Sequence, residues 1–198
     1  MPNEKKGTLD RREVVKAILE KRGDALVVTG LGSSCYDAGV HDHPNTFYLW
    51  GAMGAAAMVG LGLALAQPSR RVVVITGDGE MLMGLGALAT IGARKPGNLS
   101  IVIMDNELYA ETGMQPTHTA RGVSLSGMAK AANFAVAETV FTDEDLEAGI
   151  AALYEAPGPV LLDVKVSGKR YPMSIRLRDG AHIKNRFREN LLGQKAFD

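Results

Sequence analysis

Short, nearly continuous apolar runs alternate with longer segments of helical periodicity along most of the chain. Strands that are buried on both faces, as in parallel sheets, have this uninterrupted apolar character. Helices that connect such strands would cover both faces of one sheet. The pattern predicts an α/β fold, a three-layer sandwich with a mostly parallel sheet. The predicted strands are residues 25–29, 71–76, 99–104, 134–137 and 160–164.

The segments between these strands predict helices with recognisable ends. A first amphipathic helix follows Thr8, which can cap it, and ends at Gly23. Thr142 and Asp145 have the spacing of a capping box at the start of a later helix. Residues 30–45 are rich in turn formers, and we expect a loop there. Further helices are predicted at residues 55–66, 81–94, 124–132 and 143–154.

Composition and charge narrow the class of protein. The 198 residues are 46% apolar and 22% charged, which fits one soluble globular domain. A net charge of zero gives no global attraction to nucleic acid or membranes. The single cysteine, Cys35, excludes an intrachain disulfide and a metal site made only of cysteines. With a polar N-terminus and no long apolar run, we expect a cytoplasmic protein.

Two polar residues follow neighbouring predicted strands. Gly77-Asp78-Gly79 closes the strand at 71–76, and Asn106 follows the strand at 99–104. A strand–helix–strand unit brings the ends of its parallel strands to the same sheet edge. A carboxylate and an amide oxygen at this edge can bind Mg²⁺, which also takes phosphate oxygens. The two glycines let the backbone approach a phosphate where a helix begins.

This arrangement resembles the thiamine diphosphate-binding motif of the decarboxylase and acetohydroxyacid synthase superfamily. The segment Trp50-Gly51-Ala52-Met53-Gly54 is similar to a second pattern of that family, which precedes a Gly/Ala-rich helix. In such enzymes the glycine carbonyl accepts a hydrogen bond from the cofactor, and the bulky residue two positions later keeps the cofactor bent. Gly51 and Met53 hold these positions here. Alternatively, the small residues only let a helix pack closely on the sheet, and both interpretations are compatible.

Over residues 11–166 the chain resembles the cofactor-binding (PP) domain of this superfamily, in particular sulfopyruvate decarboxylase β subunits and phosphonopyruvate decarboxylases. The resemblance implies that Asp78, Asn106 and the backbone carbonyl of Leu108 bind Mg²⁺. A carboxylate at Glu80, where relatives often carry Ser, would repel a diphosphate, so we expect it to point away or to contact only through its N–H. The implied contacts with thiamine diphosphate are Ser33, Gly51, Ala52, Met53, Gly77, Asp78, Gly79, Glu80, Asn106, Leu108, Tyr109 and Ala110.

The resemblance also implies a partner. Enzymes of this superfamily need a Glu on a pyrimidine-binding (PYR) domain to activate the cofactor. One α/β domain takes up the whole chain, so we expect the PYR domain on a separate α subunit, in an α2β2 or larger hetero-oligomer. The implied reaction is decarboxylation of an anionic 2-oxo acid to CO₂ and an aldehyde. A carboligase, the thiamine-binding subunit of an oxidoreductase and a non-catalytic diphosphate-binding module remain alternatives.

Other polar residues have two interpretations each. His118 lies in a loop that resembles the Gly-Gln-Pro-Thr segment of these decarboxylases, so it is either near the reaction centre and catalytic or an incidental surface residue. The adjacent side chains of residues 41–43, His-Asp-His, point in different directions and suit a polar loop at a subunit interface better than one metal, and catalysis by one of the histidines is the alternative. Ser33 and Ser34 stand where relatives place diphosphate-contacting hydroxyls. Cys35 is expected to be a buried small residue.

The chain ends in a basic segment. From residue 165 to 198 there are nine Lys or Arg and three Asp or Glu, a net charge of +6 against −6 for the rest. We expect a domain at 1–166 and a C-terminal extension at 167–198 that packs on the domain or on a partner, with a helix near 186–192. Most of its charges, and His182, should face solvent or a subunit. One or two of Lys169, Arg170, Arg176 and Arg178 are candidates to bind an anionic substrate or partner.

Overall fold

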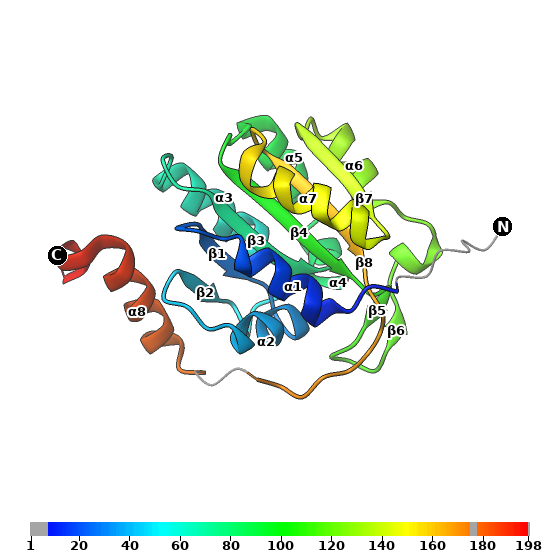
Figure 1. Ribbon diagram of the computed structural model, residues 1–198, viewed down its shortest axis with the longest axis horizontal. Helices are drawn as coiled ribbons and strands as arrows, with labels where there is room; N and C mark the ends of the chain where they lie inside the picture. Colours follow the sequence, from blue (N-terminus) through cyan, green and yellow to red (C-terminus); the bar gives the residue numbers. More distant parts are fainter. Residues whose placement is uncertain (1–7, 175–177, 198) are drawn as a thin grey trace.

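The computed structural model, which describes residues 8–174 and 178–197, has a six-stranded sheet at its centre (Figure 1). The strands of this sheet are β1 Leu26–Thr29, β2 Thr46–Tyr48, β3 Val72–Gly77, β4 Leu99–Asp105, β7 Val136–Val140 and β8 Val160–Lys165. Their order is β2-β1-β3-β4-β8-β7, and every neighbouring pair is parallel. A separate antiparallel pair consists of β5 Leu108–Tyr109 and β6 Gln115–Pro116. The predicted fold is confirmed.

Helices cover both faces of the sheet (Figure 1). Their bounds are α1 Arg11–Glu20, α2 Ser33–Val40, α3 Ala56–Ala66, α4 Asp78–Met83, α5 Gly86–Arg94, α6 Leu125–Ala131, α7 Asp143–Glu155 and α8 Gly180–Leu192, with short 3-10 turns η1 Thr119–Arg121 and η2 Gly193–Phe197. One apolar cluster lies between the sheet and α1, α2 and α7, and a second lies between the sheet and α3, α5 and α6. Val73 and Ile75 of β3 enter the first cluster, whereas Val72 and Val74 enter the second. Strands buried on both faces explain the continuous apolar runs.

The segment 30–45 was expected to be a loop, and this prediction is wrong. It contains α2, and β2 begins immediately after it. The turn-forming residues shape the start of α2 instead, where Gly32 has a positive φ of 72° that favours glycine. β2 is a three-residue strand at the edge of the sheet that pairs with β1.

The helix predicted at 81–94 is broken into α4 and α5. At Gly84, between them, a Cβ atom would overlap the backbone carbonyl oxygen of Gly54. The two glycines therefore let backbone pack against backbone. This contact holds the turn that carries Met53 against the end of α4.

Some element boundaries also differ from the predictions. The cap of α1 is Asp10 and not Thr8, because the Asp10 side chain accepts a hydrogen bond from the Arg12 N–H at 3.0 Å. The predicted strand at 134–137 is β7, which begins at residue 136 after the Phe134 N–H closes α6 by bonding to the Ala129 carbonyl. The predicted cap of α7 is confirmed, since Thr142 accepts from the Asp145 N–H.

The described part of the basic extension packs on its own chain. α8 begins earlier than expected and lies against the edge strand β2, with the rings of Phe187 and Phe47 5.4 Å apart between centroids. Arg186 forms a two-pronged ion pair with Asp42, with N–O distances of 2.8 and 3.0 Å. The His-Asp-His loop at 41–43 therefore anchors α8 within the chain. No helix in the described ranges is both long enough and apolar enough to cross a membrane.

The tail residues named in advance have different outcomes. His182 is exposed, as expected. Lys169 and Arg170 are exposed, and the Lys169 ammonium lies 3.1 Å from the Asp10 carboxylate. Arg176 lies outside the described residues. The domain boundary at residue 166 stays a prediction, because α8 adds Ile183 and Phe187 to the two apolar clusters.

Candidate functional site

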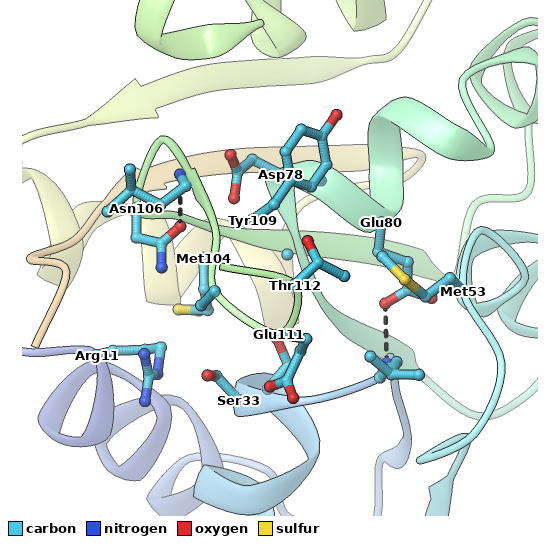
Figure 2. A pocket seen from close by; sticks show the side chains of 16 residues that line it. Arg11, Ser33, Met53, Asp78, Glu80, Met104, Asn106, Tyr109, Glu111 and Thr112 are labelled. Carbon is cyan, nitrogen blue, oxygen red and sulfur yellow. Dashed lines mark hydrogen bonds between the residues drawn. The ribbon is translucent and has the colours of Figure 1, made fainter. Parts of the chain in front are cut away.

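A cleft opens at the carboxyl ends of β1, β3 and β4 (Figure 2). The chain leaves β1 toward β2 on one side and leaves β3 toward β4 on the other, so the strand order reverses between β1 and β3. Open α/β sheets bind ligands outside the strand ends at such a point. Residues from the β1–α2 loop, the start of α4 and the segment after β4 line the cleft, together with Met53.

All residues predicted to contact the cofactor line this cleft except Gly51 and Ala52. These two lie in the turn immediately before Met53, which is 37% exposed. His118 is exposed and lies outside the lining, between Thr117 and Thr119, whose side chains are buried. Sequence reasoning missed other lining residues, namely Arg11, Leu31, Met104, Glu111 and Thr112.

Asp78 is a buried carboxylate in the wall of the cleft, with an exposed fraction of 2%. The hydroxyl of Thr117 donates to it at 2.6 Å, and Thr117 lies 2.9 Å from the hydroxyl of Thr119. Burial, and after it the nearby charge of Asp105, raises the pKa of Asp78 to about 7. Among the described residues Asp78 forms no ion pair. The wall thus contains a carboxylate whose charge is not offset by an ion pair with any cation in the described part of the chain.

The negative charge of Asp105, at the end of the neighbouring strand β4, is neutralised by Lys165. Asp105 lies in register with Lys165 of β8, whose ammonium is 2.5 Å from its Oδ2. The same ammonium lies 3.2 Å from Glu107. Burial would lower the pKa of Lys165, but the hydrogen bond to Asp105, the charges of Asp105 and Asp163 and the hydrogen bond to Glu107 together outweigh this effect and raise it. Asp163, also buried nearby, has its pKa raised to about 8 by burial and by the charge of Asp105.

Asn106 shapes the segment after β4. Its Oδ1 accepts a hydrogen bond from the Leu108 N–H at 3.0 Å, an Asx turn (Figure 2). The oxygen keeps a second lone pair for another partner. Within the ranges that the structure describes, no group of three or more His, Cys, Asp and Glu could hold a metal ion.

Glu80 is held between the loops that form the cleft. Its Oε2 accepts a hydrogen bond from the Thr76 hydroxyl at 2.7 Å. The same oxygen accepts a second one from the Leu31 N–H at 3.0 Å (Figure 2). A Cβ atom on Gly30 would overlap this oxygen, so the approach requires glycine. Burial raises the pKa of Glu80, and the hydrogen bond from Thr76 opposes that rise. The carboxylate joins β3 to the loop after β1.

The start of α2 faces the cleft through Ser33 and Ser34. Cys35, one residue further, is fully buried, and burial raises the pKa of its thiol to about 11. A thiol with this pKa is a poor nucleophile at neutral pH. Cys35 is therefore a core residue, as expected.

Comparison with known proteins identifies the class. Residues 32–164 match the family model described as thiamine pyrophosphate enzyme, C-terminal TPP binding domain, and the chain belongs to this family. The resemblance seen in the sequence is confirmed.

Individual relatives refine this placement. The chain is 38% identical over 187 residues to the sulfopyruvate decarboxylase subunit beta of Methanothermobacter thermautotrophicus, covering 93% of this chain and 97% of that protein. It is 39% identical over 152 residues to the phosphonopyruvate decarboxylase of Streptomyces viridochromogenes, covering 76% of this chain and 38% of that protein. A solved structure of a candidate thiamin diphosphate-dependent enzyme from Mycobacterium smegmatis is similar in fold, with a TM-score of 0.71 and 24% identity over 83% of this chain and 33% of that one.

Proposed function

We propose that this chain is the thiamine diphosphate- and Mg²⁺-binding subunit of a two-subunit 2-oxo acid decarboxylase, similar to sulfopyruvate and phosphonopyruvate decarboxylases. The reaction would convert an anionic 2-oxo acid to CO₂ and an aldehyde. The observation that supports the proposal best is the cleft itself, which gathers Asp78, Asn106, Ser33 and Met53 at one sheet edge.

The residues at this edge fit a magnesium ion. Asp78, Asn106 and the carbonyl of Leu108 would supply oxygen ligands, the type that Mg²⁺ prefers. The ion would offset the charge of Asp78, which no described cation neutralises. Asp105 needs no such ion because Lys165 already pairs with it.

The residues also fit the diphosphate of the cofactor. Ser33 and the backbone of residues 77–80 would bind it, and the Gly77 backbone is open to a ligand because nothing lies within 4 Å of where its Cβ would be. Glu80 would contribute only its N–H, since its carboxylate bonds to Thr76 and Leu31. Tyr109 and Ala110 would close the cleft from the segment after β4.

The other end of the cofactor would lie against Met53, with Gly51 and Ala52 beside it. A partly exposed methionine in the cleft suits the role of a support that keeps the cofactor bent. When bound, thiamine diphosphate supplies the electron sink that the loss of CO₂ requires. The exposed position of His118 gives no support within this chain for a catalytic role.

A second polypeptide would complete the site. The cleft encloses a volume of about 80 Å³, whereas pockets that enclose a ligand of this size have roughly 300–1,000 Å³. The Methanothermobacter relative is named as a subunit beta, and the chain spans 38% of the Streptomyces relative. We therefore assign the activating Glu to a PYR domain on an α subunit, in an α2β2 or larger assembly. A cytoplasmic location stays a prediction.

The proposal is tested by measuring decarboxylation of sulfopyruvate and phosphonopyruvate with Mg²⁺ and thiamine diphosphate. We expect no turnover by the chain alone and aldehyde formation when a PYR-domain subunit is added. Full activity of the chain alone would contradict the divided site. Product analysis and electron-acceptor assays on the same mixture distinguish the alternatives, because a carboligase gives an acyl-transfer product and an oxidoreductase reduces the acceptor.

A further inference from the structure

We infer that Arg11 binds the diphosphate of the cofactor, an assignment that rests on the proposed function. Arg11 is the first residue of α1 and is only 5% exposed, yet it lines the cleft beside Ser33 and Asn106 (Figure 2). Arginine is rarely buried to this extent without a partner. Arg11 has partners within the chain, the Asp37 carboxylate and the Lys169 carbonyl, but these do not use all of its hydrogen-bond donors.

Two guanidinium groups share one buried carboxylate here. The Nε atoms of Arg11 and Arg12 both pair with Asp37, which is fully buried. Arg12 does not line the cleft, and its Nη2 donates to the Pro172 carbonyl at 2.8 Å. Within this cluster, one negative charge pairs with two positive charges.

Arg11 retains hydrogen-bond donors for a ligand. Its Nη1 lies 3.5 Å from the Lys169 carbonyl, at the limit of a hydrogen bond, and its Nη2 bonds to no residue in the described part of the chain. A guanidinium presents its N–H groups as a planar fork that matches phosphate oxygens. The ion pair with Asp37 fixes the direction of this fork, which lowers the entropy lost on binding.

The charges around the cleft show why this cation matters. Arg11 is the only Lys or Arg among the residues that line the cleft, all of which are described, whereas Asp78, Glu80 and Glu111 are acidic. A diphosphate carries more negative charge than one Mg²⁺ neutralises. Arg11 is placed to offset the remainder near Ser33, away from the carboxylate of Asp78.

If Arg11 had only a structural role, it would serve to hold α1 against α2 through Asp37. Arg12 also pairs with Asp37, so an Arg12 variant is the control for this structural role. Mg²⁺–thiamine diphosphate is titrated by calorimetry into the full chain and into its complex with the PYR-domain subunit. We expect Arg11→Met to weaken binding about 10- to 100-fold, the loss of a charge-assisted hydrogen bond. Arg12→Met, which also removes a partner of Asp37, should change affinity less than about threefold. Arg11→Lys, which keeps the charge without the fork, should lie between wild type and Arg11→Met.

The outcomes separate this inference from the proposed function. Unchanged affinity in Arg11→Met, or equal losses in the Arg11 and Arg12 variants, would overturn the role of Arg11 while the binding site stands. A wild-type chain that binds no cofactor in either form would overturn the proposed function and this inference together. Thermal unfolding of each variant checks that it folds. If Arg11→Met does not fold, Arg11→Lys decides, and a wild-type affinity in that variant would overturn recognition of the diphosphate by the guanidinium of Arg11.

Discussion

Substituting Asp78 by Asn should stabilise the free chain while removing its affinity for the cofactor. The carboxylate is buried, and its charge is close to that of Asp105. Asn keeps the shape of the side chain and an oxygen that can accept the hydrogen bond from Thr117. The substitution therefore removes mainly the charge, which is unfavourable in the free chain and needed in the proposed magnesium site.

The size of the effect follows from the pKa of Asp78. Burial and Asp105 raise this pKa from 3.8 to about 7, and at about 1.4 kcal/mol per pH unit the difference corresponds to about 4 kcal/mol as an upper bound. Between these two pH values the folded chain holds a proton that the unfolded chain has released. Its free energy of unfolding therefore falls as the pH rises from about 4 to about 7. At pH 8 we expect Asp78→Asn to be about 2–4 kcal/mol more stable than wild type, and at pH 4 the two should be nearly equal.

Urea unfolding between pH 4 and pH 8, in buffer without divalent metal, measures this difference. Asp163 also has a raised pKa and contributes to the pH dependence of both proteins, so the difference between the curves is the informative quantity. The exposed Asp24 provides a control, because Asp24→Asn should leave the curve unchanged. Mg²⁺–thiamine diphosphate should then stabilise wild type but not Asp78→Asn. A variant that is less stable than wild type at pH 8 without metal would refute the reasoning.

Four further substitutions have expected outcomes. Gly84→Ala should lower the free energy of unfolding by about 1–3 kcal/mol in urea titrations, because its Cβ would overlap a backbone carbonyl. Phe187→Ala should cost about 3–4 kcal/mol in the same assay, because it removes a buried ring between α8 and the sheet. Asp10→Ala removes the cap of α1 and should cost about 1–2 kcal/mol at pH 7. Burial opposes the low pKa of Asp10, but hydrogen bonds from Tyr171 and Lys169 hold it at about 2, so this contribution should be lost as the pH falls from about 4 to 2. Met53→Ala should change stability by less than about 1 kcal/mol, since the side chain is partly exposed, and should slow proton exchange at the thiazolium carbon in the reconstituted complex.

Each of these predictions has a control or a contradicting result. Gly86→Ala is matched to Gly84→Ala, because nothing lies within 4 Å of the added Cβ, and equal losses in both would contradict the role of the backbone contact. Leu192→Ala, at the exposed end of α8, should cost much less than Phe187→Ala. A pH-independent loss in Asp10→Ala would argue against the ionic part of the cap. Unchanged proton exchange in Met53→Ala would remove its proposed role.

The parts of the fold that the sequence predicts well depend on local pattern and on the geometry of parallel sheets. β4 and β8 are buried along their whole length, so their apolar runs leave little ambiguity. Because consecutive parallel strands end at one edge, the positions of Asp78 and Asn106 in the chain were enough to place both residues in one cleft.

The features that sequence reasoning missed depend on contacts between distant segments. The break before α5 results from the approach of Gly84 to Gly54, although the Gly-Leu-Gly run at 84–86 is a local signal that could have predicted it. Arg11 lines the cleft because Asp37, twenty-six residues later, fixes its guanidinium. A single sequence shows neither pairing, since an Arg at the start of a helix ordinarily faces solvent.

Two nearby carboxylates, Asp105 and Asp78, show how a stable fold can contain one buried charge that lacks a partner. Asp105 and Asp78 lie near the ends of neighbouring parallel strands and are linked through the hydroxyls of Thr117 and Thr119. Asp105 pairs with Lys165, which lies opposite it in the sheet, so the fold itself neutralises the charge of Asp105. Asp78 has no such partner in the described chain, and its charge costs stability until a ligand supplies one. Magnesium and cofactor would relieve this unfavourable charge when they bind. Asp78→Asn removes the charge, so it should stabilise the free chain and abolish binding.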